Sequence, residues 1–397
     1  MTKSKFREFL FEAKHRTGLL VAVATVAVFL YMGVGAVAQS KSTLSALPPT
    51  PQAPKDNPTT PAKVALGRLL FWDPLLSGPQ DVACASCHHP QNGYAEDRDL
   101  SLGVTAIGLG SKRRQAPGSS IPIVKRNSPT VLNIAFSGSD ESGRYDPATA
   151  PMFWDMRVKT LEKQALEPLK AHEEMRGTTY PEDEAVASVV AKLQANAEYR
   201  SLFAGAFGSE QPVNAENLGR AIAAFERTLL ANNSPFDRYM RGDRSAMTEE
   251  QVSGMRRFES VGCVKCHNGP MFSDYKLHVM GVPDNPALPA SDDGAEKTYA
   301  FRTASLRNLA FTAPYEHNGM FRTLSDVVGF YEDARGGRSR NPNVSSEKLD
   351  PLIRELGDFD EEDVDLVEFL RALSDDSFDK TIPERVPSGL PVGGKIQ

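Results

Sequence analysis

The sequence predicts a mostly α-helical protein with long loops, and three observations lead to this fold class. Apolar residues recur at helical spacing in several short segments, whereas the strict alternation typical of strands is sparse. The chain of 397 residues contains 30 Gly and 28 Pro, which interrupt regular structure. Its composition, 40% hydrophobic and 24% charged, is that of a globular protein and excludes a disordered chain.

Each expected helix has one apolar face, and several have a residue that begins them. Pro181 is expected to open one helix. Thr248 and Gln251 form a capping-box pattern for another, and Thr323 and Asp360 are the expected N-caps of the last two. The apolar faces comprise Leu66, Leu69 and Leu70; Val186, Val189, Val190 and Leu193; Leu218, Ile222, Phe225 and Leu229; Leu324, Val327, Val328 and Tyr331; and Val364, Val367 and Leu370.

Residues 1–38 are expected to direct export. A basic start, from Lys3 to Arg16, precedes a continuous apolar run at 18–38 that ends in Ala-Val-Ala. This layout is typical of a secretory signal peptide, but the run is also long enough for an uncleaved membrane anchor, which needs about 20 residues. Both alternatives place the rest of the chain in the periplasm, with or without a membrane tether. The Pro-rich stretch 39–60 is expected to be an extended linker.

All four cysteines lie in two copies of the pattern C-x-x-C-H, at 84–88 (CASCH) and 263–267 (CVKCH). Two thiols at this spacing can form thioethers with the two vinyl groups of one haem, and the adjacent histidine can bind the iron. The sequence therefore predicts two covalently attached c-type haems. The expected attachment residues and iron ligands are Cys84, Cys87 and His88 for the first haem, and Cys263, Cys266 and His267 for the second.

Other uses of the four cysteines fit the pattern less well. An exported protein can hold disulfides, but a disulfide does not require a histidine after each cysteine pair. A four-cysteine zinc site usually joins its two C-x-x-C pairs across roughly 15–20 residues, and the two pairs here lie far apart. His89 is an alternative to His88 as the iron ligand, although the register of the motif favours His88.

A short helical segment precedes each haem motif, and this weak internal repeat suggests two related units. The predicted organisation is therefore two c-type cytochrome domains with long loops, at 61–235 and 236–375, followed by a polar tail at 376–397. The formal charge of −6 argues against a nucleic-acid partner, which would require a basic surface.

Three further motifs occur in order with the two haem motifs: RNSPTVLN at 126–133, FWD at 153–155 and SLRN at 305–308. With them the chain resembles the bacterial di-haem cytochrome c peroxidase family, which includes the MauG-type enzymes, over most of residues 60–375. The resemblance implies an enzyme that uses hydrogen peroxide. It also implies a peroxidatic haem in the N-terminal domain and an electron-transfer haem in the C-terminal domain.

The resemblance further implies four active-site residues. Glu174 would move a proton between the two peroxide oxygens, Gln164 would hydrogen-bond the bound peroxide, and Pro168 would shape the pocket. Trp154 would relay electrons between the haems. The residues alone favour these roles less, because most carboxylates are solvated and most tryptophans lie in the core. Pro168 also interrupts the helix, so spacing does not show that Gln164 and Glu174 converge.

A structural calcium ion between the haem domains is implied in the same way. The matching positions are Asn127, through its side chain, and Thr312 and Pro314, through their carbonyl oxygens. Calcium accepts such oxygen ligands, and water would complete its coordination. The residues alone would not suggest this site.

Two departures from the family pattern bear on the function. Some members have a second histidine ligand in the loop after the first motif, but no histidine occurs here between His89 and His172. The first haem is therefore expected to be open to peroxide. Where other members have a methionine ligand for the second haem, this chain has Tyr331, as MauG-type enzymes do. A phenolate favours ferric and higher states, whereas a thioether favours ferrous iron.

Alternatives to Tyr331 as the distal ligand of the second haem stay open. Tyr331 is also explained as a core residue on the apolar face of its helix. Met320 and His278 are alternative ligands, and the resemblance places His317 near the same haem.

Three functions follow from these features. The first is a MauG-like oxidoreductase that passes oxidising equivalents from peroxide to a partner protein or a bound substrate. The second is a detoxifying peroxidase that takes electrons from a small cytochrome c or a cupredoxin. The third is a non-enzymatic di-haem electron carrier, which the missing loop histidine disfavours because a carrier normally keeps both irons six-coordinate.

Overall fold

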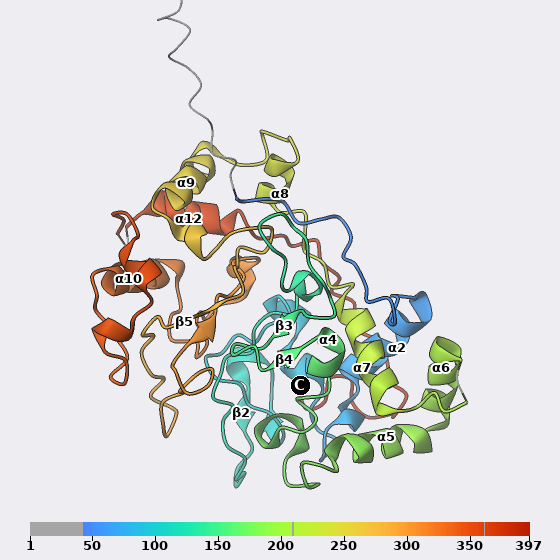
Figure 1. Cartoon of the computed structure of the whole chain (residues 1–397). Coiled ribbons are helices and arrows are strands. Elements are labelled where there is room, and N and C mark those ends of the chain that lie inside the picture. Colours follow the sequence, from blue (N-terminus) through green and yellow to red (C-terminus); the bar gives the residue numbers. More distant parts are fainter. Residues whose placement is uncertain (1–42, 209, 361) are drawn as a thin grey trace, which may run out of the picture. The chain divides into compact units, whose positions relative to one another are not determined.

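The computed structural model describes residues 43–397 except 209 and 361, and these residues form one compact unit (Figure 1). The expected signal or anchor at 1–38 lies outside the described residues. Within the described part of the chain, no helix is long and apolar enough to cross a membrane.

Short helices joined by long irregular segments make up most of the described chain, which confirms the mostly helical fold class. The α-helices are α2 (Pro61–Trp72), α3 (Cys84–Cys87), α4 (Leu161–Gln164), α5 (Ala185–Ala195), α6 (Ala197–Phe207), α7 (Ala215–Glu226), α8 (Pro235–Met240), α9 (Glu249–Ser260), α10 (Leu324–Arg335), α11 (Pro351–Arg354) and α12 (Val364–Arg371). Single turns of other helix types are η1 (Pro74–Leu76), η2 (Pro90–Asn92), η3 (Gly110–Lys112), η4 (Ile134–Phe136), the π-helical η5 (His172–Arg176), η6 (Cys263–Lys265), η7 (Leu309–Phe311) and η8 (Ser346–Lys348).

The strands are two residues long and pair only locally. Each sheet of the described chain is one antiparallel pair, so none of them forms a layer of the fold. The pairs are β1 (Ala106–Ile107) with β2 (Arg114–Gln115), β3 (Pro151–Met152) with β4 (Val158–Lys159), and β5 (Leu277–His278) with β6 (Phe301–Arg302).

Two of the expected N-caps are confirmed, and the last is wrong. Thr248 and Gln251 form a reciprocal capping box on α9, and Thr323 caps α10. The N-cap of α12 is Asp363 instead of Asp360, because the Asp363 carboxylate accepts the backbone N–H of Leu366 at 3.2 Å. The helix expected after Pro181 begins at Ala185, after a non-helical turn.

The helix before each haem motif packs closely on a later helix through a glycine. A Cβ at Gly67 of α2 would overlap the carbonyl oxygen of Ala221 in α7, and one at Gly254 of α9 would overlap that of Asp365 in α12. Both crossings therefore require a residue without a side chain. This parallel agrees with the repeat seen in the sequence.

Two of the buried clusters lie beside these crossings. The N-terminal cluster joins α2, α5, α6 and α7. The C-terminal cluster is built on edge-to-face and tilted aromatic pairs with ring centroids 5.1–6.1 Å apart, an arrangement that adds to the effect of burial alone. The rings in that cluster are Phe236, Phe258, Phe272 and Phe369.

The described part of the expected linker and the expected tail both pack on the body of the protein. Leu44 and Leu47 are almost fully buried, because they are apolar residues within an otherwise polar stretch. The segment 376–397 runs back across the N-terminal half, where Val82 pairs with Gly394, and Figure 1 marks the C-terminus among the N-terminal elements. Phe378 and Val386 lie in one core cluster with Phe71 and Trp72, so this tail carries part of the core.

Candidate active site

The first haem motif has the geometry that an iron ligand requires. Its two cysteines lie on α3, and the backbone N–H of His88 donates to the carbonyl oxygen of Cys84 at 2.9 Å. His88 Nδ1 lies 3.1 Å from the carbonyl oxygen of Tyr94. With Nδ1–H donating to this oxygen, the lone pair of His88 Nε2 is left for a metal. Burial lowers the pKa of His88 and so keeps the ring neutral.

His89 occupies a structural position. Its Nδ1 accepts the backbone N–H of Gln91 at 3.2 Å and caps η2, and its ring lies 5.5 Å from that of Trp72. With a lone pair already used for the cap, His89 is the poorer iron ligand. The arrangement favours His88, as the register of the motif predicted.

The second motif repeats the geometry of the first. The backbone N–H of His267 donates to the carbonyl oxygen of Cys263 at 2.9 Å, and His267 Nδ1 lies 2.9 Å from the carbonyl oxygen of Phe272. Burial lowers the pKa of His267 as well. Both histidines are therefore neutral and fixed in one orientation, which is the arrangement of a metal-ligating imidazole.

The arrangement of the four cysteines gives little support to their other uses. None of the four is in a disulfide. The two motifs do not combine into one cluster: among the described residues, the group of metal-type side chains within 4.8 Å of one another is Cys266, Asp274 and His278. Each motif thus stands alone, as haem attachment requires.

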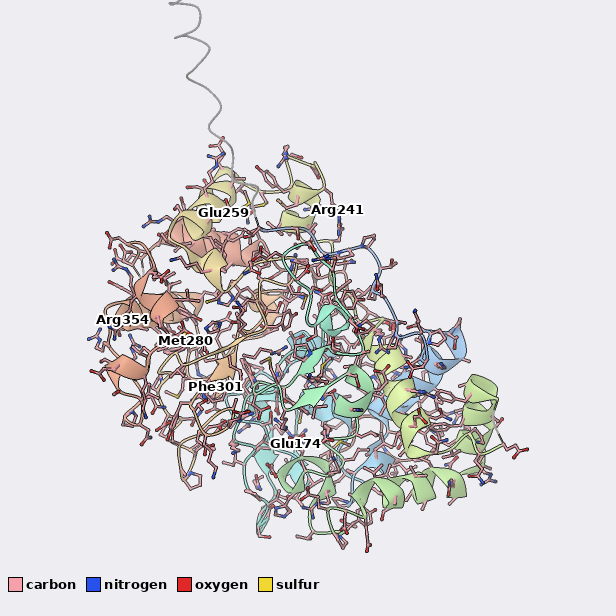
Figure 2. The ribbon with its side chains drawn as sticks, in the orientation of Figure 1. Glu174, Arg241, Glu259, Met280, Phe301 and Arg354 are labelled. Atoms are coloured by element: carbon pink, nitrogen blue, oxygen red, sulfur yellow. The ribbon has the colours of Figure 1, made fainter. Side chains whose placement is uncertain are left out.

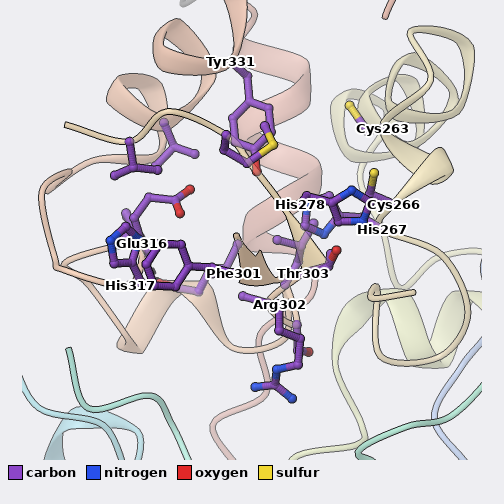
Figure 3. A pocket seen from close by; sticks show the side chains of 18 of the residues that line it. Cys263, Cys266, His267, His278, Phe301, Arg302, Thr303, Glu316, His317 and Tyr331 are labelled. Carbon is purple, nitrogen blue, oxygen red and sulfur yellow. Dashed lines mark hydrogen bonds between the residues drawn. The ribbon is translucent and has the colours of Figure 1, made fainter. Parts of the chain in front are cut away.

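A cavity of about 260 Å³ adjoins the second motif, and its lining is mostly apolar (Figure 3). Cys263, Cys266 and His267 line one part of it, and Tyr331 from α10 lines another. An apolar cavity with two thiols and a neutral imidazole at its wall fits a covalently attached haem. Burial raises the pKa of Tyr331 well above its usual value, so the phenol is neutral unless a metal binds it.

Of the alternative ligands for the second haem, His278 and Met320 are poorly placed. His278 lines the cavity, but its Nδ1 lies 2.7 Å from Asp350 and its Nε2 lies 3.2 Å from Asp274. These two carboxylates raise the pKa of His278 and leave no free lone pair. Met320 is not among the described residues that line the cavity.

Sequence reasoning missed several side chains that line this cavity, among them Met280 and Glu316. Figure 2 shows Met280 among the C-terminal elements, far from Glu174. Met280 follows His278, the last residue of β5, by two positions, and residues two apart in a strand pattern point to the same face. The spacing of Met280 from His278, a candidate ligand, was the signal that could have identified Met280. Burial raises the pKa of Glu316 to about 7, and nothing in the sequence marked this carboxyl group.

The candidate catalytic residues near the first haem are only partly brought together. Glu174 lies in η5, and π-helical turns of this kind often occur at functional sites. Glu174 and Pro168 line one polar cavity of about 250 Å³, together with Phe153. Gln164 ends α4 and is not among the described residues that line this cavity.

The carboxyl group of Glu174 keeps its proton up to a higher pH than an ordinary glutamate. Loss of hydration raises its pKa to about 7, and the neighbouring charge of Glu173 adds to this shift. A carboxyl group with a pKa near the working pH can both accept and donate a proton efficiently. The electrostatics therefore suit the acid–base role that the family resemblance implies.

Trp154 is fixed by hydrogen bonds to both halves of the chain. Its indole N–H donates to the carbonyl oxygen of Asn127 at 3.1 Å, and its own carbonyl oxygen accepts the backbone N–H of Arg302 at 2.7 Å. Trp154 lines the cavity of the second motif, and its ring lies 6.5 Å from that of His317. The ring of His317 in turn stacks on Phe301 at 3.6 Å.

The three candidate calcium ligands all line this same cavity. They are Asn127, Thr312 and Pro314. The side-chain N–H of Asn127 donates to the carbonyl oxygen of Arg98 at 2.9 Å, which leaves Oδ1 as the atom that would bind a cation. Since the carbonyl oxygen of Asn127 also holds Trp154, the candidate calcium and relay positions are directly connected.

Comparison with known proteins agrees with this geometry. The family model for the di-haem cytochrome c peroxidases matches residues 61–245. A cytochrome-c peroxidase, IdrP1, of Pseudomonas sp. strain SCT is 34% identical over 90% of this chain and 91% of its own length. The methylamine utilization protein MauG of Methylorubrum extorquens is 35% identical over 83% of both chains.

Solved structures extend the comparison to the fold. A MauG-like protein associated with microbial copper homeostasis has 28% sequence identity and a TM-score of 0.66, over 84% of this chain and 95% of that chain. The similarity spans both haem motifs and supports the prediction of a fold with cytochrome c domains. Taken with the paired C-x-x-C-H motifs and their preset histidines, these matches show that the chain belongs to the di-haem cytochrome c peroxidase family and is an enzyme of the peroxidase type.

Proposed function

We propose that this protein is a MauG-like oxidoreductase, which reacts with hydrogen peroxide at its first haem and passes oxidising equivalents through its second haem. The observation that carries the proposal is Tyr331 in the wall of the cavity beside the second haem motif. A hard phenolate ligand at this place would favour oxidised iron. Low-potential iron is a poor acceptor of electrons from high-potential donors, so the oxidising equivalents would go to another substrate. The relative named MauG is consistent with this assignment.

The first haem is proposed as the site of peroxide reaction. A haem bound there supplies the redox-active iron that reacts with peroxide. No histidine occurs between His89 and His172 to close its distal side. Glu174 would transfer a proton from one peroxide oxygen to the other, Pro168 would shape the pocket, and Gln164 would turn toward the bound peroxide.

Trp154 is proposed as the relay between the haems, and a calcium ion at Asn127, Thr312 and Pro314 as the support of that region. The hydrogen bond from the Trp154 indole to Asn127 supports both proposals, because one residue would hold the ion and the ring. Removal of calcium would then disturb communication between the haems before it unfolded the protein.

The partner is proposed to be a protein that meets this enzyme in the periplasm. The signal-like sequence of residues 1–38 supports the location, with the segment proposed to be either cleaved or kept as a membrane tether. A protein substrate or a small redox protein fits a family that moves electrons over a distance. The formal charge of −6 does not favour nucleic acid.

A second candidate function is a detoxifying peroxidase that takes electrons from a small cytochrome c or a cupredoxin. Met280 favours it, because a thioether from this cavity-lining residue would raise the potential of the second haem. The relative named cytochrome-c peroxidase is consistent with it as well. Membership of a peroxidase family leaves the non-enzymatic carrier without support.

A peroxide-turnover assay with reduced cytochrome c separates the two candidates. The MauG-like proposal expects slow turnover and a long-lived oxidised state after stoichiometric peroxide. Fast turnover that falls sharply in Met280→Leu but not in Tyr331→Phe would reject it in favour of the detoxifying peroxidase.

A further inference from the structure

Arg302 is a half-buried cation that lacks an anionic partner among the described residues. It belongs to β6, and its side chain lines the cavity of the second haem motif (Figure 3). Its Nη1 makes two long hydrogen bonds, to Ser137 Oγ at 3.4 Å and to the carbonyl oxygen of Pro151 at 3.5 Å. Its Nε is buried and has no hydrogen-bond partner among the described residues. Buried donors of a charged group are normally satisfied.

The fully buried arginines of the described chain each have a carboxylate within reach. The distances from guanidinium nitrogen to carboxylate oxygen are 3.8 Å for Arg113 and Glu96, 2.7 Å for Arg227 and Glu162, and 2.8 Å for Arg307 and Asp237. No described carboxylate lies within 4.0 Å of the Arg302 guanidinium, so its environment differs from that of these three arginines.

The charges around Arg302 do not balance. Three arginines meet two carboxylates in this region: Asp155 is paired with both Arg126 and Arg157, and Asp292 is paired with Arg126. Asp155 acts on Arg302 only at longer range. One positive charge is therefore uncompensated at the cavity wall, and burial of such a charge is strongly unfavourable unless an anion meets it.

We infer that Arg302 is the counter-ion of a propionate group of the second haem. Arg302 lines the same cavity as Cys263, Cys266 and His267, and haem carries two carboxylates of the charge that this cavity lacks. A guanidinium presents paired N–H donors that match a carboxylate. Because the backbone N–H of Arg302 also holds the carbonyl oxygen of Trp154 at 2.7 Å, one residue would position both the haem edge and the proposed relay.

The inference predicts an electrostatic effect on the second haem, whichever of the two proposed functions holds. A positive charge beside the haem stabilises the reduced state, so its removal lowers the midpoint potential. Arg302→Gln is expected to shift the reduction equilibrium of the second haem at least tenfold, which is about 59 mV for a one-electron couple. Arg302→Lys keeps the charge and is expected to shift it less than tenfold.

The test is a redox titration of each haem in the purified holoproteins. Arg371→Gln removes an exposed charge from α12, which also borders this cavity, and should leave the potential unchanged. Acetate added at constant ionic strength should not move the wild-type potential, because the propionate already occupies the site. If it does, Arg302 binds a free anion and the inference is wrong.

The remaining outcomes are also decisive. A Gln variant with both haems and an unchanged potential overturns the inference. If the Gln variant lacks the second haem, the Lys variant decides. If Arg302→Lys keeps both haems and shifts the reduction equilibrium of the second haem less than tenfold, the inference is supported. If Arg302→Lys lacks the second haem or shifts this equilibrium further, the inference is wrong, because the positive charge is then not what Arg302 supplies.

Discussion

The hydroxyl group of Ser86, inside the first haem motif, donates a hydrogen bond to the carbonyl oxygen of Gly393 at 2.8 Å. The Ser86 hydroxyl oxygen in turn accepts the backbone N–H of Ala83 at 2.9 Å. The C-terminal segment is thereby held against the loop that carries Cys84 and Cys87. The end of the chain thus contributes to the first haem site, although it follows the second haem domain in sequence.

Loss of the Ser86 hydroxyl should weaken the first haem unit. Ser86 is 1% exposed, so Ser86→Ala leaves a buried carbonyl and a buried N–H without partners and should cost about 1–3 kcal/mol. Denaturant unfolding of the holoprotein, followed by the absorbance of the haems, measures this loss. Ser245→Ala removes a similar bond in an exposed turn and should change the stability by less than about 0.5 kcal/mol. Equal midpoints for the two variants would contradict the proposed contact.

The reaction with peroxide should depend on pH through Glu174. Its pKa is raised from 4.5 to about 7, so the carboxylate that accepts the first proton from peroxide forms only as the pH rises through this value. The rate should increase from pH 5.5 to 8. Glu174→Gln should lower the rate by about 10²–10⁴-fold and remove the pH-dependent limb. Stopped-flow absorbance measures both effects, with the exposed Glu184→Gln as the control. An unchanged pH limb in Glu174→Gln would assign it to another group.

Buried Glu226 should make the protein less stable as the pH rises. Its Oε2 atom has no hydrogen-bond partner, and burial raises its pKa from 4.5 to about 8. Between these values the folded state binds the proton more tightly than the unfolded state, so stability falls with rising pH, by at most about 1.4 kcal/mol per unit. Glu226→Gln should flatten this fall in melting temperature. Glu216→Gln, on the exposed side of α7, should retain it. A fall that persists in Glu226→Gln would place its origin elsewhere.

The two glycine crossings should be intolerant of a single methyl group. Gly254→Ala would force α9 and α12 apart, because its Cβ overlaps the backbone of Asp365. A loss of about 1–3 kcal/mol is expected, with a lower yield of the second haem. Gly205→Ala in α6 meets no atom within 4 Å and should stabilise the protein by about 0.5–1 kcal/mol. Thermal melts and haem content test the pair, and a tolerated Gly254→Ala would contradict the packing.

The sequence predicted the parts of the site that local chemistry determines. The position of His88 follows from its motif, and Thr248 with Gln251 follows from capping geometry. Met280 and Arg302 were missed because their roles depend on a cavity formed by segments distant in sequence. Buried Leu44 and the packed C-terminal segment were missed for the same reason, since a few apolar residues decide the position of a polar stretch.

The most direct test of the MauG-like assignment is the EPR spectrum of the resting holoprotein and of Tyr331→Phe. The assignment predicts one high-spin ferric haem, open to peroxide, and one low-spin ferric haem whose signal changes in Tyr331→Phe. Met280→Leu, at the same cavity, should leave the low-spin signal unchanged. Two low-spin haems, indifferent to Tyr331→Phe and to stoichiometric peroxide, would contradict the account and indicate a peroxidase that must first be reduced.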